Sequence, residues 1–346
     1  MQVDYIIVGL GLAGLAFTKE LEKNKKSYLV FEDNSQNSSI VAGGIYNPVV
    51  LKRFTPVWNA TEQLNIALPF YEDLEIKFNK KYHFPINIYR IFKSVEEQNN
   101  WFAACDNPML SNYMSTKLIH EKHEGVLAGF GYGKLMNTGR IDTKSLLDDY
   151  RYYLANRKLI RNESFQYSAL KINEENHEYK GVTAGKIIFC EGFGLKNNPF
   201  FNYLPMQEAK GELITVHAPN LNIDFLIKSA LFVLPLGNNN YKVGATFNWK
   251  DKTQLPTEEG KNELISKLES FITVPYQIVD HIAGIRPTVK DRRPLVGKHP
   301  KFQNLAVLNG LGTRGVMIAP TAANALYNNL ENEKALGKEI SIDRFL

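Results

Sequence analysis

Three glycines near the start of the chain have a spacing that can bind phosphate groups. Gly9, Gly11 and Gly14 form the pattern G-x-G-x-x-G within "VDYIIVGLGLAGLAF". The first glycine of such a turn makes a tight bend, the second lets a pyrophosphate approach the backbone, and the third allows a helix to pack closely on a strand. Leu12 and Ala13, which lie inside the pattern, would open that helix and contribute to the same site. The spacing therefore predicts a dinucleotide site.

The segments on either side of the glycines have the patterns that such a turn needs. Residues 3–8 form a run that is apolar except for Asp4, which is typical of a strand buried on both faces of a parallel sheet. Apolar residues at helical spacing follow, so the positive end of a helix would face the pyrophosphate. A second apolar run ends at Glu32, about 20 residues after the turn, where a carboxylate can bind an adenosine ribose. These features fit NAD and FAD equally well.

The C-terminal part of the chain favours FAD. Residues 305–310 form another apolar strand, "GLGTRG" is a glycine-rich loop, and residues 319–330 have a helical pattern with Pro320 near the first turn. A helix start beside this loop would stabilise the negative charge of a reduced flavin. NAD needs no second site of this kind from the far end of the chain.

Composition limits the class of protein. The 346 residues are 44% hydrophobic and 22% charged, which is ordinary for a globular protein, and the net charge of +5 is scattered over the chain. We expect no membrane partner, since no apolar stretch reaches the length of a membrane span. We expect no secretory signal, because residues 3–8 are needed as a strand. Cys105 and Cys190 match no metal or redox spacing, so a cytoplasmic protein without a metal is predicted.

Seven segments occur in the order found in one enzyme superfamily. They are "GLGLAG…FED", "AGGIYNP", "KIIFCEG", "KGELITV", "FVLPLGNNNYKVGATF", "AGIRP" and "GLGTRGVMIAP". Over nearly its whole length the chain resembles the D-amino-acid oxidase and glycine oxidase superfamily of FAD-dependent oxidoreductases. The last segment is most similar to the oxidase half of the bifunctional enzyme that makes 5-methylaminomethyl-2-thiouridine in tRNA. The segment "AGIRPTVKDRRPLVG" is equally similar to glycine oxidase.

The resemblance implies an α/β fold with two domains. A Rossmann-type FAD-binding domain would be assembled from the discontinuous segments 1–75, 140–205 and 285–346. An α+β substrate domain with an antiparallel sheet would comprise residues 76–139 and 206–284.

The resemblance also implies which side chains contact the substrate. Arg286 would pair with the substrate carboxylate, unless it forms a structural salt bridge instead. Arg314 would bind the C2 carbonyl region of the flavin or share the carboxylate. Phe232 lies near the position where glycine oxidase offers a tyrosine to its substrate, which favours a larger or less polar amine. His281 falls on no motif and is expected to be a packed side chain.

The cofactor would be held mainly by glycines and by main-chain groups. Two residues depart from the pattern of the superfamily, because Cys190 and Glu191 replace small residues of its A-x-G turn. The predicted FAD-binding residues are Gly9, Gly11, Leu12, Ala13, Gly14, Glu32, Gly43, Gly44, Gly192, Gly312, Arg314, Gly315, Val316 and Met317.

The function that follows is the oxidation of an amine. A hydride would pass to the flavin from the carbon next to the nitrogen of glycine, sarcosine, a D-amino acid or a related N-substituted glycine, and the resulting imine would hydrolyse. A second function compatible with the sequence is that of a tRNA-modifying oxidase that removes carboxymethyl from carboxymethylaminomethyl-uridine. We rank it second, because the methyltransferase half of the fused enzyme is not in this sequence. The sequence is also compatible with an amine dehydrogenase that uses an acceptor other than oxygen, with a non-catalytic binding module, and with an oligomer.

Overall fold

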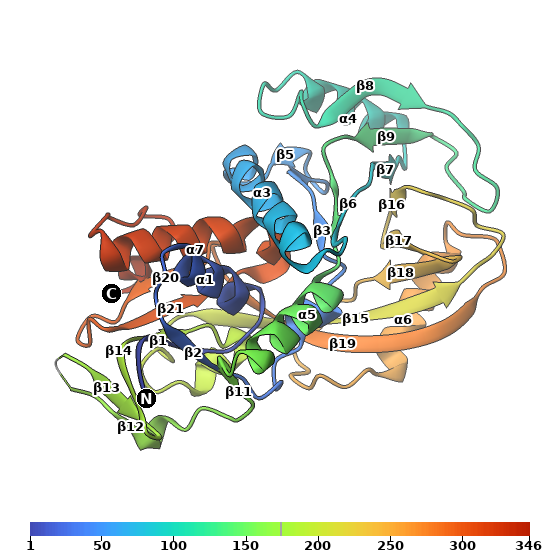
Figure 1. The fold of residues 1–346 in the computed structure, drawn as a ribbon. Coiled ribbons are helices and arrows are strands. Elements are labelled where there is room, and N and C mark those ends of the chain that lie inside the picture. The colour runs from blue at the N-terminus through green and yellow to red at the C-terminus, as the bar shows by residue number, and fades with distance from the viewer. Residues whose placement is uncertain (174) are drawn as a thin grey trace.

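The computed structural model describes residues 1–173 and 175–346. Two large sheets lie side by side in it (Figure 1). Helices α1 and α7 lie next to each other against the first sheet, and both chain termini are at this end of the molecule. No helix in the described residues is long and apolar enough to cross a membrane. The helices are α1 (Leu12–Lys23), α2 (Ser38–Val41), α3 (Ala60–Phe78), α4 (Val95–Cys105), α5 (Thr143–Asn156), α6 (Glu258–Glu269) and α7 (Gly315–Glu331).

The first sheet has a parallel centre, as the apolar runs predict. Neighbouring strands pair in parallel in the order β11, β2, β1, β14 and β21. In the β12–β13 hairpin, β13 pairs antiparallel with the first half of β14. Strand β20 pairs antiparallel with β21. The strands are β1 (Gln2–Val8), β2 (Tyr28–Phe31), β11 (Ile160–Arg161), β12 (Leu170–Lys171), β13 (His177–Tyr179), β14 (Val182–Phe189), β20 (Leu295–Lys298) and β21 (Leu305–Asn309).

The second sheet is mixed. Its strand order is β19-β15-β18-β17-β16-β7-β9-β8, with antiparallel pairing except between β16 and β7, which are parallel. The implied antiparallel sheet is thus interrupted by one parallel pair. The strands are β7 (Ile88–Ile91), β8 (Met114–Ile119), β9 (Tyr132–Leu135), β15 (Met206–His217), β16 (Leu226–Lys228), β17 (Phe232–Gly237), β18 (Asn240–Gly244) and β19 (Gln277–Val289).

Short strands lie between the two large sheets (Figure 1). The domain boundaries given above stay a prediction. A small sheet has the order β3-β10-β6, and a separate hairpin joins β4 to β5. The short strands are β3 (Ile45–Tyr46), β4 (Val49–Val50), β5 (Thr55–Pro56), β6 (His83–Pro85) and β10 (Gly139–Ile141).

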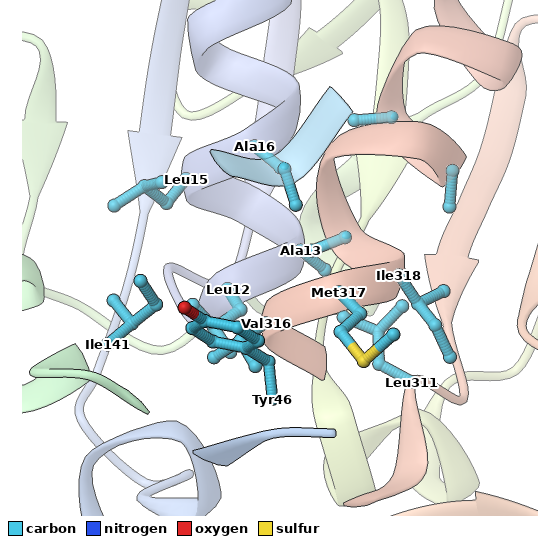
Figure 2. Close-up of a cluster of buried hydrophobic side chains, with 14 of the residues drawn as sticks. Leu12, Ala13, Leu15, Ala16, Tyr46, Ile141, Leu311, Val316, Met317 and Ile318 are labelled. Carbon is cyan, nitrogen blue, oxygen red and sulfur yellow. The ribbon is translucent and has the colours of Figure 1, made fainter. Parts of the chain in front are cut away.

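Small residues bring α1 close to its neighbours. Ala13 and Ala16 of α1 face α7 across a buried apolar cluster (Figure 2). A Cβ atom on Gly14 would lie 2.1 Å from the carbonyl oxygen of Gly9, so any larger residue would separate the helix from β1. This is the close helix–strand packing predicted for the third glycine of the turn.

Helix α7 begins earlier than its sequence pattern predicts. It starts at Gly315, which places Pro320 in the second turn instead of the first. Proline has no N–H, so the carbonyl of Val316 lacks its usual partner within the helix. The buried hydroxyl of Tyr71 in α3 donates to this carbonyl at 2.9 Å. A hydrogen bond from another helix therefore allows α7 to extend through the proline, which the local sequence could not show.

Candidate active site

A cavity of about 890 Å³ lies between the two large sheets. Most of the predicted site residues line it. Gly14 and Met317 do not, because Gly14 packs against β1 and Met317 is buried in the apolar cluster (Figure 2). The predicted residues that line the cavity are Gly9, Gly11, Leu12, Ala13, Glu32, Gly43, Gly44, Gly192, Phe232, Arg286, Gly312, Arg314, Gly315 and Val316.

The start of α1 forms one end of the cavity. Gly11 is the N-cap residue and provides no side-chain hydrogen bond to the helix. The Ser39 hydroxyl accepts the N–H of Leu12 at 3.2 Å. Glu32 is buried beside the same turn and accepts the N–H of Asn34 at 2.7 Å, and it also accepts that of Leu10. A helix start next to a carboxylate fits a pyrophosphate followed by a ribose.

Glu191 adds a second buried carboxyl group at this end. It accepts hydrogen bonds from the Tyr167 hydroxyl and, at 2.7 Å, from the Asn198 amide. Burial raises the pKa of Glu191 to about 7, although both hydrogen bonds act in the opposite direction. Glu191, one of the two residues that depart from the superfamily pattern, is therefore a carboxyl group with a raised pKa at the wall of the cavity.

The loop at Gly43 and Gly44 lies between this end and the second sheet. Gly44 has a φ of +64°, and a Cβ atom there would lie 1.8 Å from the carbonyl oxygen of Ile141. The Ile141 N–H donates to the Gly44 carbonyl at 2.9 Å, which fixes the loop against β10. A Cβ atom on Gly43 would lie 3.3 Å from the ring of Phe232. Phe232 thus reaches from the second sheet to the loop predicted to contact the flavin.

The start of α7 forms the other helix terminus in the cavity. Arg314 is its N-cap residue, and no side chain caps the helix. Within the described residues the Arg314 guanidinium makes no hydrogen bond or ion pair. Burial, together with the nearby charge of Arg292, lowers the pKa of Arg314. The guanidinium and the helix N-terminus together can stabilise negative charge that develops in the cavity.

Arg286 lies on β19 in the wall formed by the second sheet. Its Nη1 donates to the carbonyl oxygens of Thr246 at 3.2 Å and Lys210 at 3.4 Å, and the guanidinium stacks 4.3 Å from the centre of the Phe247 ring. Burial lowers the pKa of Arg286 to about 10. No carboxylate of residues 1–173 and 175–346 lies within 4.0 Å of the guanidinium, so a structural salt bridge has no partner there.

Gly211 and Phe247 were missed by the sequence analysis. A Cβ atom on Gly211 would lie 1.9 Å from Nη2 of Arg286, so this glycine makes the space that the guanidinium occupies. A lone glycine inside a strand can signal such a close approach, and "KGELITV" contains one. Phe247 carries no comparable signal. The position of His281 agrees with the expectation of a packed side chain, because its Nε2 lies 2.9 Å from a carboxylate oxygen of buried Glu212.

The cavity combines two helix starts, a buried carboxylate beside the first of them, and the guanidinium groups of Arg286 and Arg314, which have no carboxylate partner in the described residues. The family model described as "DAO: FAD dependent oxidoreductase" matches residues 4–328. The chain belongs to this family. It is therefore an enzyme that uses FAD, and the DAO fold accounts for a site built from segments that are distant in the sequence.

Curated relatives of this DAO-family chain fall into two kinds. The tRNA 5-methylaminomethyl-2-thiouridine biosynthesis bifunctional protein MnmC of Legionella pneumophila strain Philadelphia 1 is 22% identical over 99% of this chain and 57% of its own length. The chain thus spans a little over half of that relative. Glycine oxidase of Bacillus subtilis is 28% identical over 47% of this chain and 41% of its own length.

Solved structures show the same fold. The crystal structure of glycine oxidase from Geobacillus kaustophilus matches with a TM-score of 0.80 and 18% identity, over 97% of this chain and 96% of that chain. Iminodiacetate oxidase from Chelativorans sp. BNC1 matches with a TM-score of 0.77 and 16% identity, over 99% and 98%. At these identities the similarity concerns the fold.

Proposed function

We propose that this DAO-family enzyme oxidises a carboxylate-bearing amine at the carbon next to the nitrogen. The observation that carries the proposal is the guanidinium of Arg286, which faces the cavity without a carboxylate partner in the described residues. A planar guanidinium binds a carboxylate through two parallel hydrogen bonds and so fixes its orientation. Glycine, sarcosine, a D-amino acid or a related N-substituted glycine has the required carboxylate and amine.

The cavity residues fit FAD from one end to the other. The start of α1 and Glu32 would hold the pyrophosphate and a ribose, and the loop at Gly43 and Gly44 would lie along the ring. When bound, the flavin accepts the hydride. Arg314 and the N-terminus of α7 would stabilise the negative charge that this transfer produces.

The chain's own contribution is orientation. Arg286 would hold the carboxylate and thereby set which face of the adjacent carbon points toward the loop at Gly43. Phe232 would shape the space between them and provides no hydroxyl. No histidine lines the cavity in the described part of the chain. An amine that loses its proton before it binds needs no protein base, so positioning would supply most of the catalysis.

An anaerobic titration tests the proposal. Glycine, sarcosine, D-alanine and D-proline are added in turn to the FAD-loaded enzyme, and the oxidised-flavin absorption band is followed. We expect at least one of them to bleach the band. Replacing Arg286 by Met should lower the second-order rate of bleaching by about 100-fold, since a charge-assisted pair is lost. The exposed Arg53→Met is the matched control and should leave the rate unchanged. Equal rates in the Arg286→Met and parent enzymes would refute the role of Arg286.

One observation favours tRNA as a second candidate substrate. The side chains of Phe247 and Trp249 are 59% and 55% exposed, and Phe247 lies against Arg286. Exposed aromatic rings beside a site can stack on the bases of single-stranded nucleic acid. If none of the four amines bleaches the flavin, while tRNA carrying carboxymethylaminomethyl-uridine does, the tRNA-modifying function replaces the first proposal. Oxygen uptake after reduction then distinguishes an oxidase from a dehydrogenase.

A further inference from the structure

A lysine with no partner lies in the part of the cavity formed by the second sheet. Lys228 ends strand β16 and lines the cavity together with Ala230 and Phe232. Its side chain is half-buried. In residues 1–173 and 175–346 its ammonium group makes no hydrogen bond and no ion pair. A cation that is withdrawn from water without a counter-ion is destabilising, so this position favours an anion brought in by a ligand.

Strand register shows where Lys228 lies relative to the rest of the site. Lys228 is the cross-strand partner of Phe232, and Phe232 is the partner of Gly244. Directly paired residues project from the same face of a sheet, so Lys228 is on the face that lines the cavity. Between β16 and β19, which carries Arg286, lie the strands β17, β18 and β15. Four strand spacings correspond to about 19 Å across the sheet.

The other charges near Lys228 are already neutralised or are also positive. Arg90, its partner on β7, is paired with Glu97 at 2.5 Å and donates to the carbonyl of Ser229 at 3.0 Å. Lys267 is paired with Glu263 at 2.5 Å. Burial and then the charges of Arg90, Lys267 and Lys93 lower the pKa of Lys228 to about 8. Of these three cations only Lys93 makes no ion pair in the described residues, and its charge makes an anion at Lys228 more favourable still.

We propose that Lys228 binds a second anionic group, a carboxylate or a phosphate, at the far end of the substrate. The preferred substrate is then an N-substituted glycine that bears this group at the end of its N-substituent. This inference rests on the proposed function, which places the glycine carboxylate at Arg286. Glycine and sarcosine are too short to reach from Arg286 to Lys228, so they would leave the second position empty.

Thioether analogues test the inference by binding alone. Calorimetry on the FAD-loaded enzyme compares (ω-carboxyalkylthio)acetates, with roughly three to six methylene groups, with alkylthioacetates of equal length that end in a methyl group. Sulfur replaces the amine, so these compounds bind without being oxidised. Phosphonate-terminated analogues form a third series, which distinguishes a carboxylate from a phosphate as the second anion.

We expect the best dianion to bind about tenfold or more tightly than its methyl-terminated counterpart. Lys228→Met should reduce this ratio below threefold, and Lys228→Arg should retain it. Lys117→Met, an exposed position on the same sheet, is the matched control and should keep the full ratio. Equal binding of dianions and monoanions by the parent enzyme would overturn the inference, as would a ratio unchanged in Lys228→Met. Failure of the proposed function is distinguishable, because Arg286→Met would then affect neither series.

Discussion

The hydrogen bond from Tyr71 to the Val316 carbonyl gives a prediction that the structure quantifies. Tyr71→Phe removes the hydroxyl and leaves a buried carbonyl at the start of α7 without a donor, because Pro320 cannot supply one. An unsatisfied buried group of this kind costs about 1–3 kcal/mol. The donor–acceptor distance of 2.9 Å and the 1% exposure of Tyr71 place the expected loss near 2 kcal/mol.

A second substitution isolates the cause. Pro320→Ala restores an N–H that can donate to Val316 within the helix, so Tyr71→Phe should cost less than about 1 kcal/mol in that background. The four proteins form a double-mutant cycle, and their free energies of unfolding are measured by urea denaturation. The FAD dissociation constant is measured in parallel, because Val316 lines the cavity.

Tyr132→Phe is the control for the loss of a hydroxyl. The Tyr132 hydroxyl is buried and has no hydrogen-bond partner in the described chain, so its removal should be neutral or stabilising. The reasoning is refuted if Tyr71→Phe costs the same in both backgrounds, or if it costs no more than Tyr132→Phe.

Three further substitutions test other parts of the site. Glu191→Gln should raise the free energy of unfolding at pH 8 by up to about 3 kcal/mol, and it should remove the part of the pH dependence of this free energy that Glu191 causes. The folded-state pKa of Glu191 is raised to about 7. The contribution of Glu191 to stability is therefore complete below its unfolded-state pKa and is lost as the pH rises through 7. Denaturation of the parent and the variant at pH 4, 6 and 8 measures this loss. Gly211→Ala should lower kcat/KM by about 100-fold, measured by steady-state kinetics, because its Cβ would displace the Arg286 guanidinium by more than about 1 Å. Gly44→Ala should destabilise the fold by more than about 2 kcal/mol and weaken FAD binding, both readable by denaturation with and without FAD, since its Cβ would meet the Ile141 carbonyl.

The parts of the site that the sequence could predict depend on local geometry. The turn from Gly9 to Gly14 follows from a single strand and a single helix, and both form where the pattern indicates. The FAD cofactor likewise follows from short segments whose order along the chain is distinctive. Such signals are visible in one stretch of sequence, because the interactions behind them join residues that are close in the chain.

The remaining features depend on pairs that are distant in the chain. Gly211 matters because β15 pairs with β19 and places it beneath Arg286. The early start of α7 depends on Tyr71 of a different helix. Lys228 is notable only because its position in the sheet leaves it without a partner in the described residues. The glycine in "KGELITV" can signal a close approach but does not show that Arg286 is the partner, and residue type gives no indication of the other two relationships.

The unpaired charges around the cavity differ in sign between its two ends in the described residues, and under the proposed function this difference would orient both ligands. Carboxyl groups surround the end where α1 begins, and they can accept hydrogen bonds from ribose hydroxyls. Cationic groups without a carboxylate partner in the described residues line the other end, where, under the proposed function, hydride transfer would create negative charge and a substrate carboxylate would bind. A dinucleotide bound in the reverse direction would bring its anionic parts against the carboxyl groups, so the charge pattern opposes that orientation. The lining carboxyl groups are Glu32, Asp33, Glu163, Glu191 and Glu263, of which Glu263 is paired with the lining Lys267. In the described residues, Lys228, Arg286 and Arg314 are the lining cations without a carboxylate partner.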